Sequence, residues 1–198
     1  MPAFDFILRW VTFVMWLFWL FHYWHGLRGI REEFQKTIME ARTRFDRGLV
    51  SFLGVITLSP LAMILLASFG LLTVQPWARP LPVVAAGTLA TLLGMLAAYF
   101  SRRHLGKCWT SRIDVPEHQI VDSGPYRIVR HPIYTAMLVM HLGITVVFAT
   151  WWTWVIFGLI ALCYVLKALA EERVLASHSE DYRAYQQYVR FRLVPGIW

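Results

Sequence analysis

Long apolar stretches, separated by shorter charged segments, run through the whole chain. Five can be distinguished, and they cover residues 6–27, 49–74, 81–100, 134–150 and 152–170. Each approaches the ~20 residues that an α-helix needs to cross the ~30 Å hydrocarbon layer of a membrane. Because the turn between the last two stretches is minimal, these two helices are expected to form an antiparallel hairpin. The pattern predicts an all-α, polytopic membrane protein with about five transmembrane helices.

The segment between the first two apolar stretches, residues 28–48, has a helical pattern of its own. Apolar side chains recur there at steps of three and four, at Ile30, Phe34, Ile38, Ala41 and Phe45. This spacing places them on one face of a helix whose other face is charged. We predict an interfacial helix on the cytoplasmic membrane surface, with a partner-binding helix as the alternative.

A second interfacial helix is predicted near the C-terminal end, over residues 179–188. Ser179 is a typical N-cap, and two acidic residues follow it in the first turn, where they interact favourably with the helix dipole. Three tyrosines then fall on one helix face, at Tyr182, Tyr185 and Tyr188. This stripe indicates either packing against the rest of the protein or the wall of a pocket.

The composition agrees with a membrane protein, since 58% of the 198 residues are hydrophobic and the mean hydropathy is +0.50. The net charge of +7 comes from Lys and Arg in the segments between apolar stretches. This placement fits the positive-inside rule and anionic lipids, and we expect no nucleic-acid partner. It predicts an outside N-terminus, a cytoplasmic C-terminus and, in a bacterium, an inner-membrane location. Cys108 and Cys163 are expected to be free, and we predict no metal site.

The densest run of polar and aromatic residues, Ser123 to Tyr134, comes directly before the fourth apolar stretch. Its Gly-Pro pair indicates a turn, and Pro132 suits the first turn of a helix. At the same end of the predicted hairpin, Glu171 and Glu172 follow the fifth apolar stretch. Ionisable groups beside hydrocarbon are costly unless they are paired or used. The cluster is therefore either a salt-bridge network in a charged interfacial collar or a ligand-binding site.

At these residues the chain resembles the integral-membrane methyltransferases that include isoprenylcysteine carboxyl methyltransferases and phospholipid N-methyltransferases. The matching segments follow in order with ordinary spacing, at residues 105–109, 118–121, 123–134, 171–175, 181–185 and 192–195. They lie in the C-terminal half of the chain. We therefore expect N-terminal membrane helices over residues 1–100 and a cofactor-binding catalytic region over residues 101–198.

The resemblance implies S-adenosylmethionine as the cofactor. The cofactor-binding residues that it implies are His118, Gln119, Ile120, Val121, Tyr126, His131, Pro132, Ile133, Tyr134 and Glu171, with Glu172 as the competing acid. Three basic residues are the catalytic candidates. Lys167 stands where relatives often have an arginine, and its point charge cannot grip a carboxylate in bidentate fashion. Arg192 matches a family arginine, and Arg130 either orients the site or anchors to lipid headgroups.

The implied reaction is methyl transfer to a lipophilic or lipid-tailed acceptor, with the isoprenylcysteine-type carboxyl group as the nearest named substrate. An anionic acceptor needs alignment and exclusion of water more than acid–base help. An amine acceptor needs a base, for which Glu171, Glu172 and His131 are the nearby options. The alternatives are a phospholipid amine N-methyltransferase, a small-thiol methyltransferase, a sterol-type reductase relative with a nicotinamide cofactor, and a non-catalytic membrane scaffold.

Overall fold

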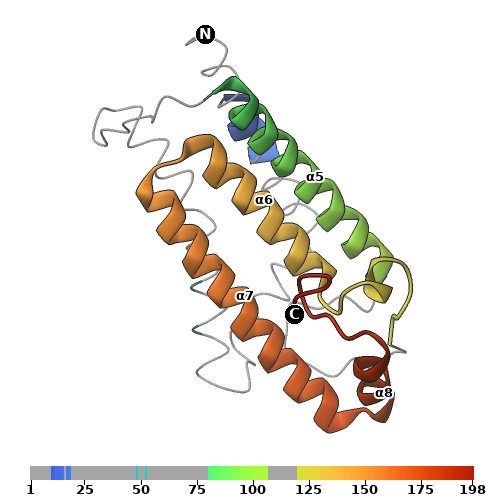
Figure 1. Cartoon of the computed structure of the whole chain (residues 1–198). Coiled ribbons are helices and arrows are strands. Elements are labelled where there is room, and N and C mark those ends of the chain that lie inside the picture. The colour runs from blue at the N-terminus through green and yellow to red at the C-terminus, as the bar shows by residue number, and fades with distance from the viewer. Residues whose placement is uncertain (1–9, 16, 19–47, 49–51, 53–79, 107–119) are drawn as a thin grey trace.

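The computed structural model describes residues 10–15, 17–18, 48, 52, 80–106 and 120–198, and no strand occurs among them. Figure 1 shows three long helices, α5 (Leu81–Leu105), α6 (Pro132–Phe148) and α7 (Trp151–His178). The 3₁₀ helix η2 (Gly124–Arg127) precedes α6, and α8 (Glu180–Tyr188) follows α7. Within the described part of the chain, the all-α prediction is confirmed.

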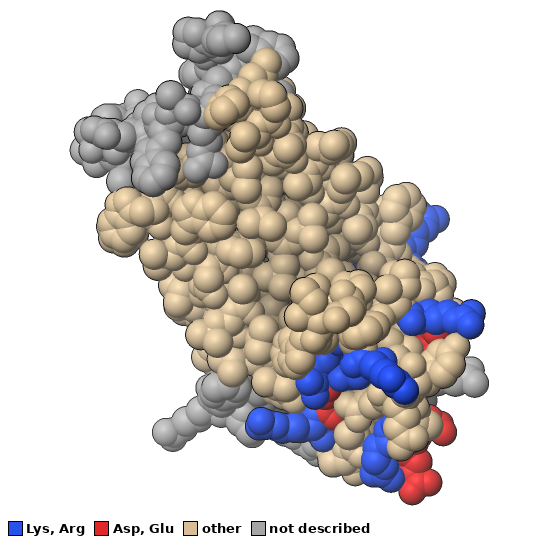
Figure 2. Space-filling view, viewed as in Figure 1, with Lys and Arg blue, Asp and Glu red and all other residues tan. Residues whose placement is uncertain are grey.

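Helices α5 and α7 have the lengths and surfaces of membrane helices. By length and composition, α5 with 25 residues and α7 with 28 are able to cross a membrane, and α6 is a shorter apolar helix. Large apolar side chains are exposed on them, such as Leu93 and Phe100 on α5 and Leu162 on α7. Charged side chains instead gather at the end of the molecule where α7 meets α8 (Figure 2). This distribution suits apolar helices in lipid with a polar end at the interface.

Of the first two predicted spans, the structure describes only the helical residues 10–15, 17–18 and 52. The Thr12 hydroxyl in the first of these pieces lies 3.0 Å from the Thr88 hydroxyl on α5. The predicted interfacial helix over 28–48 lies outside the described residues except for its last position. The described residues therefore establish two candidate membrane spans, and the total of five stays a prediction.

Helices α5 and α6 pack antiparallel with their backbones in close contact, because glycines line the interface. A Cβ on Gly94 would lie 2.5 Å from the Met140 backbone nitrogen, and a Cβ on Gly143 would lie 2.5 Å from the Gly87 oxygen. Small residues at such a crossing let membrane helices approach closely. The surrounding core cluster joins α5, α6 and α7 and consists of Met95, Ala98, Ala136, Met137, Met140, Ile144, Ile160, Cys163 and Tyr164.

The predicted hairpin of α6 and α7 is confirmed, and Ala149 and Thr150 form its turn. Ala149 ends α6 in the left-handed region, with φ 51°. Thr150 is the N-cap of α7 and forms a capping box with Thr153, in which each threonine hydroxyl accepts a hydrogen bond from the backbone N–H of the other residue. Helix α7 continues past the apolar stretch to His178. Glu171 is the first residue after that stretch and is still part of the helix.

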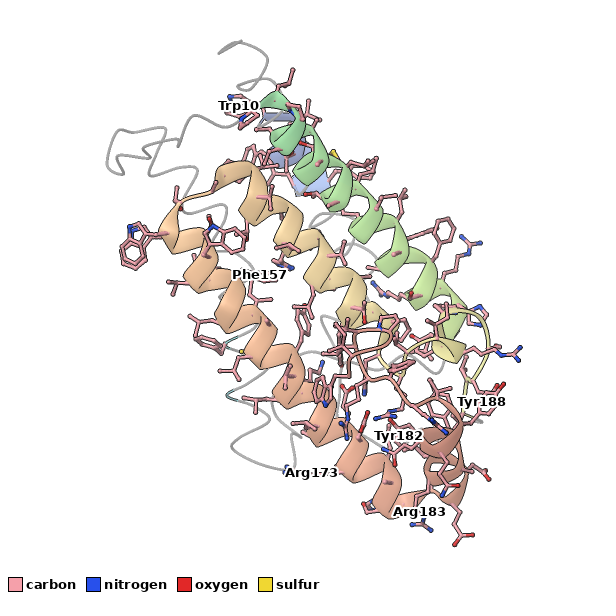
Figure 3. All side chains as sticks on the ribbon, viewed as in Figure 1. Trp10, Phe157, Arg173, Tyr182, Arg183 and Tyr188 are labelled. Carbon is pink, nitrogen blue, oxygen red and sulfur yellow. The ribbon has the colours of Figure 1, made fainter. Side chains whose placement is uncertain are left out.

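Helix α8 begins where the sequence predicts. The Ser179 hydroxyl accepts a hydrogen bond from the Tyr182 backbone N–H at 3.2 Å. Tyr182 and Tyr185 are buried, but Tyr188 is 62% exposed and points outward (Figure 3). Each step of three residues rotates about 60° away from the previous one in a helix of 3.6 residues per turn. The predicted stripe is therefore correct for two tyrosines and wrong for Tyr188.

The C-terminal segment, residues 189–198, returns from α8 across the start of α6. The Arg130 backbone N–H donates to the Phe191 carbonyl at 2.9 Å, and the His131 N–H donates to the Arg192 carbonyl at 3.0 Å. The Thr135 hydroxyl donates to the Leu193 carbonyl at 2.6 Å. These bonds fix the segment against the polar end of the hairpin.

Candidate functional site

The polar stretch before α6 is held between the end of α5 and α8. Gly124 has φ 57°, and a Cβ there would lie 2.8 Å from the His104 ring, so this turn strongly favours glycine. The Tyr185 hydroxyl donates to the Tyr126 carbonyl at 2.6 Å. Burial raises the pKa of both tyrosines above the usual range, so their hydroxyls stay protonated at neutral pH. The stretch is thereby anchored before it reaches Arg130.

Glu172 is the centre of a buried ion-pair network. Its side chain is 5% exposed, and its carboxylate accepts from Arg130 Nε at 2.7 Å and from Arg130 Nη2 at 3.2 Å. Arg192 Nε donates to the same carboxylate at 2.9 Å, and Gln186 Nε2 donates to it at 3.3 Å. Charge-assisted, bidentate hydrogen bonds of this kind hold a carboxylate in one orientation.

The Arg130 guanidinium connects α7 to the C-terminal segment. Besides its two bonds to Glu172, its Nη1 donates to the Val189 carbonyl at 2.7 Å and to the Arg190 carbonyl at 3.0 Å. The residue is only 8% exposed. The interpretation of Arg130 as an anchor to lipid headgroups is therefore wrong, because its guanidinium is bound inside the protein. Its geometry agrees with the alternative, a residue that orients the site.

His131 lies between the two acids of α7. Its Nε2 is 3.2 Å from Glu172 Oε1, and its Nδ1 is 3.6 Å from Glu171 Oε2. Its ring stacks on the Tyr134 ring with centroids 5.4 Å apart, and the Tyr134 ring stacks on that of Tyr164 at 5.1 Å. Three stacked rings therefore extend from α6 to α7 beside Glu171.

Glu171 has different partners from those of Glu172. The Tyr134 hydroxyl donates to Glu171 Oε1 at 2.5 Å, and Lys167 Nζ lies 3.7 Å from the same oxygen. Lys167 Nζ also lies 5.2 Å from the centroid of the Tyr134 ring. The Glu171 side chain is 14% exposed, against 5% for Glu172. Glu171 is therefore the more exposed of the two acids, and it takes no part in the Arg130 ion pair.

The structure brings half of the predicted site residues into one cluster at the polar end of the hairpin. They are Arg130, His131, Tyr134, Lys167, Glu171, Glu172 and Arg192. Pro132 is the buried first residue of α6, and Ile133 packs against the main core. Ile120 packs against the buried tyrosines of α8, and Val121 is partly buried next to it in the chain. His118 and Gln119 lie outside the described residues.

Two residues at this site were not predicted from the sequence. Tyr164 belongs to the aromatic stack, and Gln186 belongs to the network around Glu172. Tyr164 lies three residues before Lys167 and seven before Glu171, so helical spacing places it on the same face and was an available signal. The contact of Gln186 exists because α8 folds back toward α7, and no local pattern indicates that.

In the part of the chain that the structure describes, these features indicate a helical membrane protein with a cluster of ionisable and aromatic groups at the polar end of a helical hairpin. The chain belongs to the phospholipid methyltransferase family, because the family model matches residues 82–181, half of the 198-residue chain. The matched region includes Arg130, His131 and the acids of α7, whereas Arg192 lies beyond it. Membership of a methyltransferase family implies, in general, S-adenosylmethionine as the methyl donor. The comparison with curated proteins gives no match.

Proposed function

We propose that this chain is an integral-membrane methyltransferase that transfers a methyl group from S-adenosylmethionine to a lipophilic acceptor. The observation that carries the proposal is the arrangement of Glu171, Tyr134 and Lys167 at the polar end of the hairpin. This arrangement lies within the region that matches the methyltransferase family. It gives a reachable carboxylate beside aromatic faces, at the boundary between an apolar and a polar layer.

The residues around Glu171 fit the chemistry of the methyl donor. S-Adenosylmethionine carries an ammonium group and a sulfonium cation, and when bound it supplies a methyl group activated by the sulfonium. The Glu171 carboxylate would hold the ammonium group through charge-assisted hydrogen bonds. The rings of Tyr134 and Tyr164 would offer faces that favour a cation. Lys167 would then release Glu171 and keep its charge for the acceptor side.

Glu172 is assigned a positioning role in this proposal. Its carboxylate is already bound by Arg130, Arg192, Gln186 and His131. Freeing it for a ligand would leave Arg130 as an uncompensated buried charge, which is strongly unfavourable. We therefore prefer Glu171 as the cofactor acid and Glu172 as the residue that holds the C-terminal segment over the site. That segment would exclude water from the reaction.

For the acceptor, we favour a carboxylate of the isoprenylcysteine type. In this proposal Glu171 holds the cofactor and Glu172 is bound by Arg130 and Arg192, so neither acid is left as a base for an amine. The side chains of Lys167 and Arg192 are 11% and 31% exposed and would attract an anionic group. An anionic acceptor needs no base, and a lipid tail would extend between the helices into the hydrocarbon layer.

Phospholipid amine N-methylation is the second candidate, and the description of the matching family favours it. It would require a group that takes the amine proton. His131 is next to both acids, but hydrogen bonding to Glu172 already occupies its Nε2.

A methyl-transfer assay tests the proposal directly. The full chain in lipid nanodiscs is incubated with methyl-tritiated S-adenosylmethionine and, separately, with N-acetyl-S-farnesylcysteine, dioleoyl phosphatidylethanolamine or a long-chain alkyl thiol. We expect label in the farnesylated carboxylate. Label in the phosphatidylethanolamine instead would support the second candidate, and no label in any acceptor would contradict the proposed function. Glu171→Gln is the variant expected to lose transfer, and Glu180→Gln, at an exposed position of α8, is its control.

A further inference from the structure

His141 is a buried polar residue in the middle of α6, and it has no role in the methyl transfer proposed above. It is 3% exposed, and its Nδ1 lies 2.7 Å from the Met137 carbonyl oxygen. Because a carbonyl oxygen only accepts, Nδ1 carries the proton and the neutral ring presents a lone pair at Nε2. This Nε2 atom is buried and has no hydrogen-bond partner within the part of the chain that the structure describes.

The helical register places His141 on the α6 face that meets α7. It lies seven residues after Tyr134, which stacks on Tyr164 of α7, and four residues before Thr145, whose hydroxyl donates to the Thr153 carbonyl of α7 at 3.4 Å. Residues at these spacings share one face of a helix. Seven residues rise about 10 Å, so His141 lies deeper in the apolar layer than the Glu171 cluster.

The opposite face of α6 is closed. There Gly143 and Met140 meet the backbone of α5 at distances that leave no room for an added carbon atom. Helix α6 meets α7 through side chains, as the stacked rings of Tyr134 and Tyr164 show. Side chains can move aside, whereas packed backbones cannot without shifting the helices. A ligand that enters the hairpin from the bilayer would therefore enter between α6 and α7 and pass His141.

An unpaired nitrogen at this place is costly to the folded protein. Buried polar groups are nearly always hydrogen-bonded, and an exception needs an explanation. An ionisable side chain inside a membrane helix is a functional candidate by default. A leucine at position 141 would fill the space without a polar atom. Departures from the most stable choice are expected where a protein binds or reacts.

We propose that His141 determines acceptor specificity, with its Nε2 accepting a hydrogen bond from an N–H group of the lipid-tailed methyl acceptor. The inference rests on the proposed function and adds a residue for recognising the acceptor. The N–H group is either the amide next to the carboxyl group of an isoprenylcysteine-type acceptor or the amine of a phospholipid. In the first case the nitrogen is attached to the carbon atom that bears the carboxyl group, and in the second case the amine is itself the reacting group.

Two matched pairs of probes test the inference by binding, without the need for turnover. N-Acetyl-S-farnesylcysteine is compared with S-farnesylthiopropionic acid, which lacks the acetamido N–H. Dioleoyl phosphatidylethanolamine is compared with dioleoyl phosphatidylcholine, which has no N–H. Each probe is titrated into the full chain in nanodiscs, with and without S-adenosylhomocysteine. We expect the wild type to bind the N–H member of one pair about tenfold more tightly, and that pair identifies the acceptor class.

The variants assign this preference to His141. In His141→Leu and His141→Phe, which lack the accepting nitrogen, the two members of the pair should bind within about twofold of each other. His141→Gln should keep part of the preference, because its amide oxygen can accept. Met140→Leu, on the α6 face toward α5, should keep all of it. A merely structural role for His141 would lower the melting temperature, whereas we expect His141→Leu to melt no lower than the wild type.

Two results would overturn the inference. The wild type could show no preference within either pair, or His141→Leu and His141→Phe could both keep the wild-type preference while still folded. Failure of the proposed function gives a separate signal, because the wild type would then not bind S-adenosylhomocysteine in the same titrations.

Discussion

Glu171 and Glu172 are adjacent in the chain, but they project about 100° apart around α7, and this angle gives them different partners. Glu172 points toward Arg130 and the C-terminal segment and is tightly paired there. Glu171 points toward Tyr134 and Lys167. A buried, fully paired carboxylate is expensive to release, so a cofactor would bind the acid with fewer charged partners.

Substitution of Lys167 tests whether this residue serves the methyl acceptor and not the cofactor. Lys167→Met keeps the length of the side chain and removes its charge. We expect S-adenosylhomocysteine binding to change little, because Glu171 remains, and kcat/KM for a carboxylate acceptor to fall by about 100-fold. Tritium transfer and isothermal titration measure the two quantities on the same preparation.

Lys167→Arg is the control for this prediction, since it restores the positive charge and should recover most of the transfer rate. If Lys167→Met lost cofactor binding as severely as Glu171→Gln does, Lys167 would belong to the cofactor site.

Sequence alone was enough to bring His131, Tyr134 and Glu171 to one place. The short turn after α6 forces α7 to run back, and helical register then sets which residues meet. It was not enough to distinguish Glu171 from Glu172. That distinction depends on Arg192 and Gln186, which reach Glu172 only after the chain beyond α7 has folded back.

At the scale of elements, the C-terminal segment and the hairpin hold each other in place. Hydrogen bonds to the backbone carbonyls of residues 191–193 join this segment to the start of α6, and the ion pairs of Glu172 join both to α7. The network is buried, so its loss would leave Arg130 without its partner in a poorly solvated place. The segment that covers the proposed site thus depends on one carboxylate of α7.

Glu172→Gln tests this dependence. The variant removes the charge, keeps the size, and leaves two guanidinium groups uncompensated. We expect a loss of about 3 kcal/mol in stability, since breaking a buried ion pair by removing one partner is strongly destabilising. Thermal unfolding measures the loss, and limited trypsin digestion should show faster cleavage after Arg190 and Arg192.

The matched control is Glu180→Gln, which removes the ion pair with Arg183 at a side chain that is 92% exposed. Exposed pairs of this kind contribute little, so neither readout should change. Equal melting temperatures for Glu172→Gln and the wild type would contradict the positioning role.

The start of a helix could be predicted where a residue with a strong preference for the first turn or the N-cap stands in the sequence. Pro132 begins α6 and Ser179 caps α8, both as expected from the sequence. The close approach of α5 and α6 was not predicted, although Gly87, Gly94 and Gly143 are visible in the sequence. Glycines in apolar helices indicate a possible close crossing, but which helices cross depends on the tertiary arrangement.

In the molecule as a whole, ionisable side chains gather at one end of a largely apolar helical body. The charged side chains around α8 and the end of α7 mark that end (Figure 2). A cofactor that is soluble in water would reach it from the aqueous side, and a lipid-tailed acceptor would reach it from the bilayer. The cytoplasmic orientation of this end stays a prediction from the distribution of Lys and Arg.

Whether Glu171 binds the cofactor can be measured by isothermal titration of S-adenosylhomocysteine into the full chain in nanodiscs. We expect the wild type and Glu180→Gln to bind with equal affinity, and Glu171→Gln to bind at least about tenfold more weakly, because a hydrogen bond to a charged group is lost. Absence of binding by the folded wild type, or equal binding by Glu171→Gln, would contradict the account of this site.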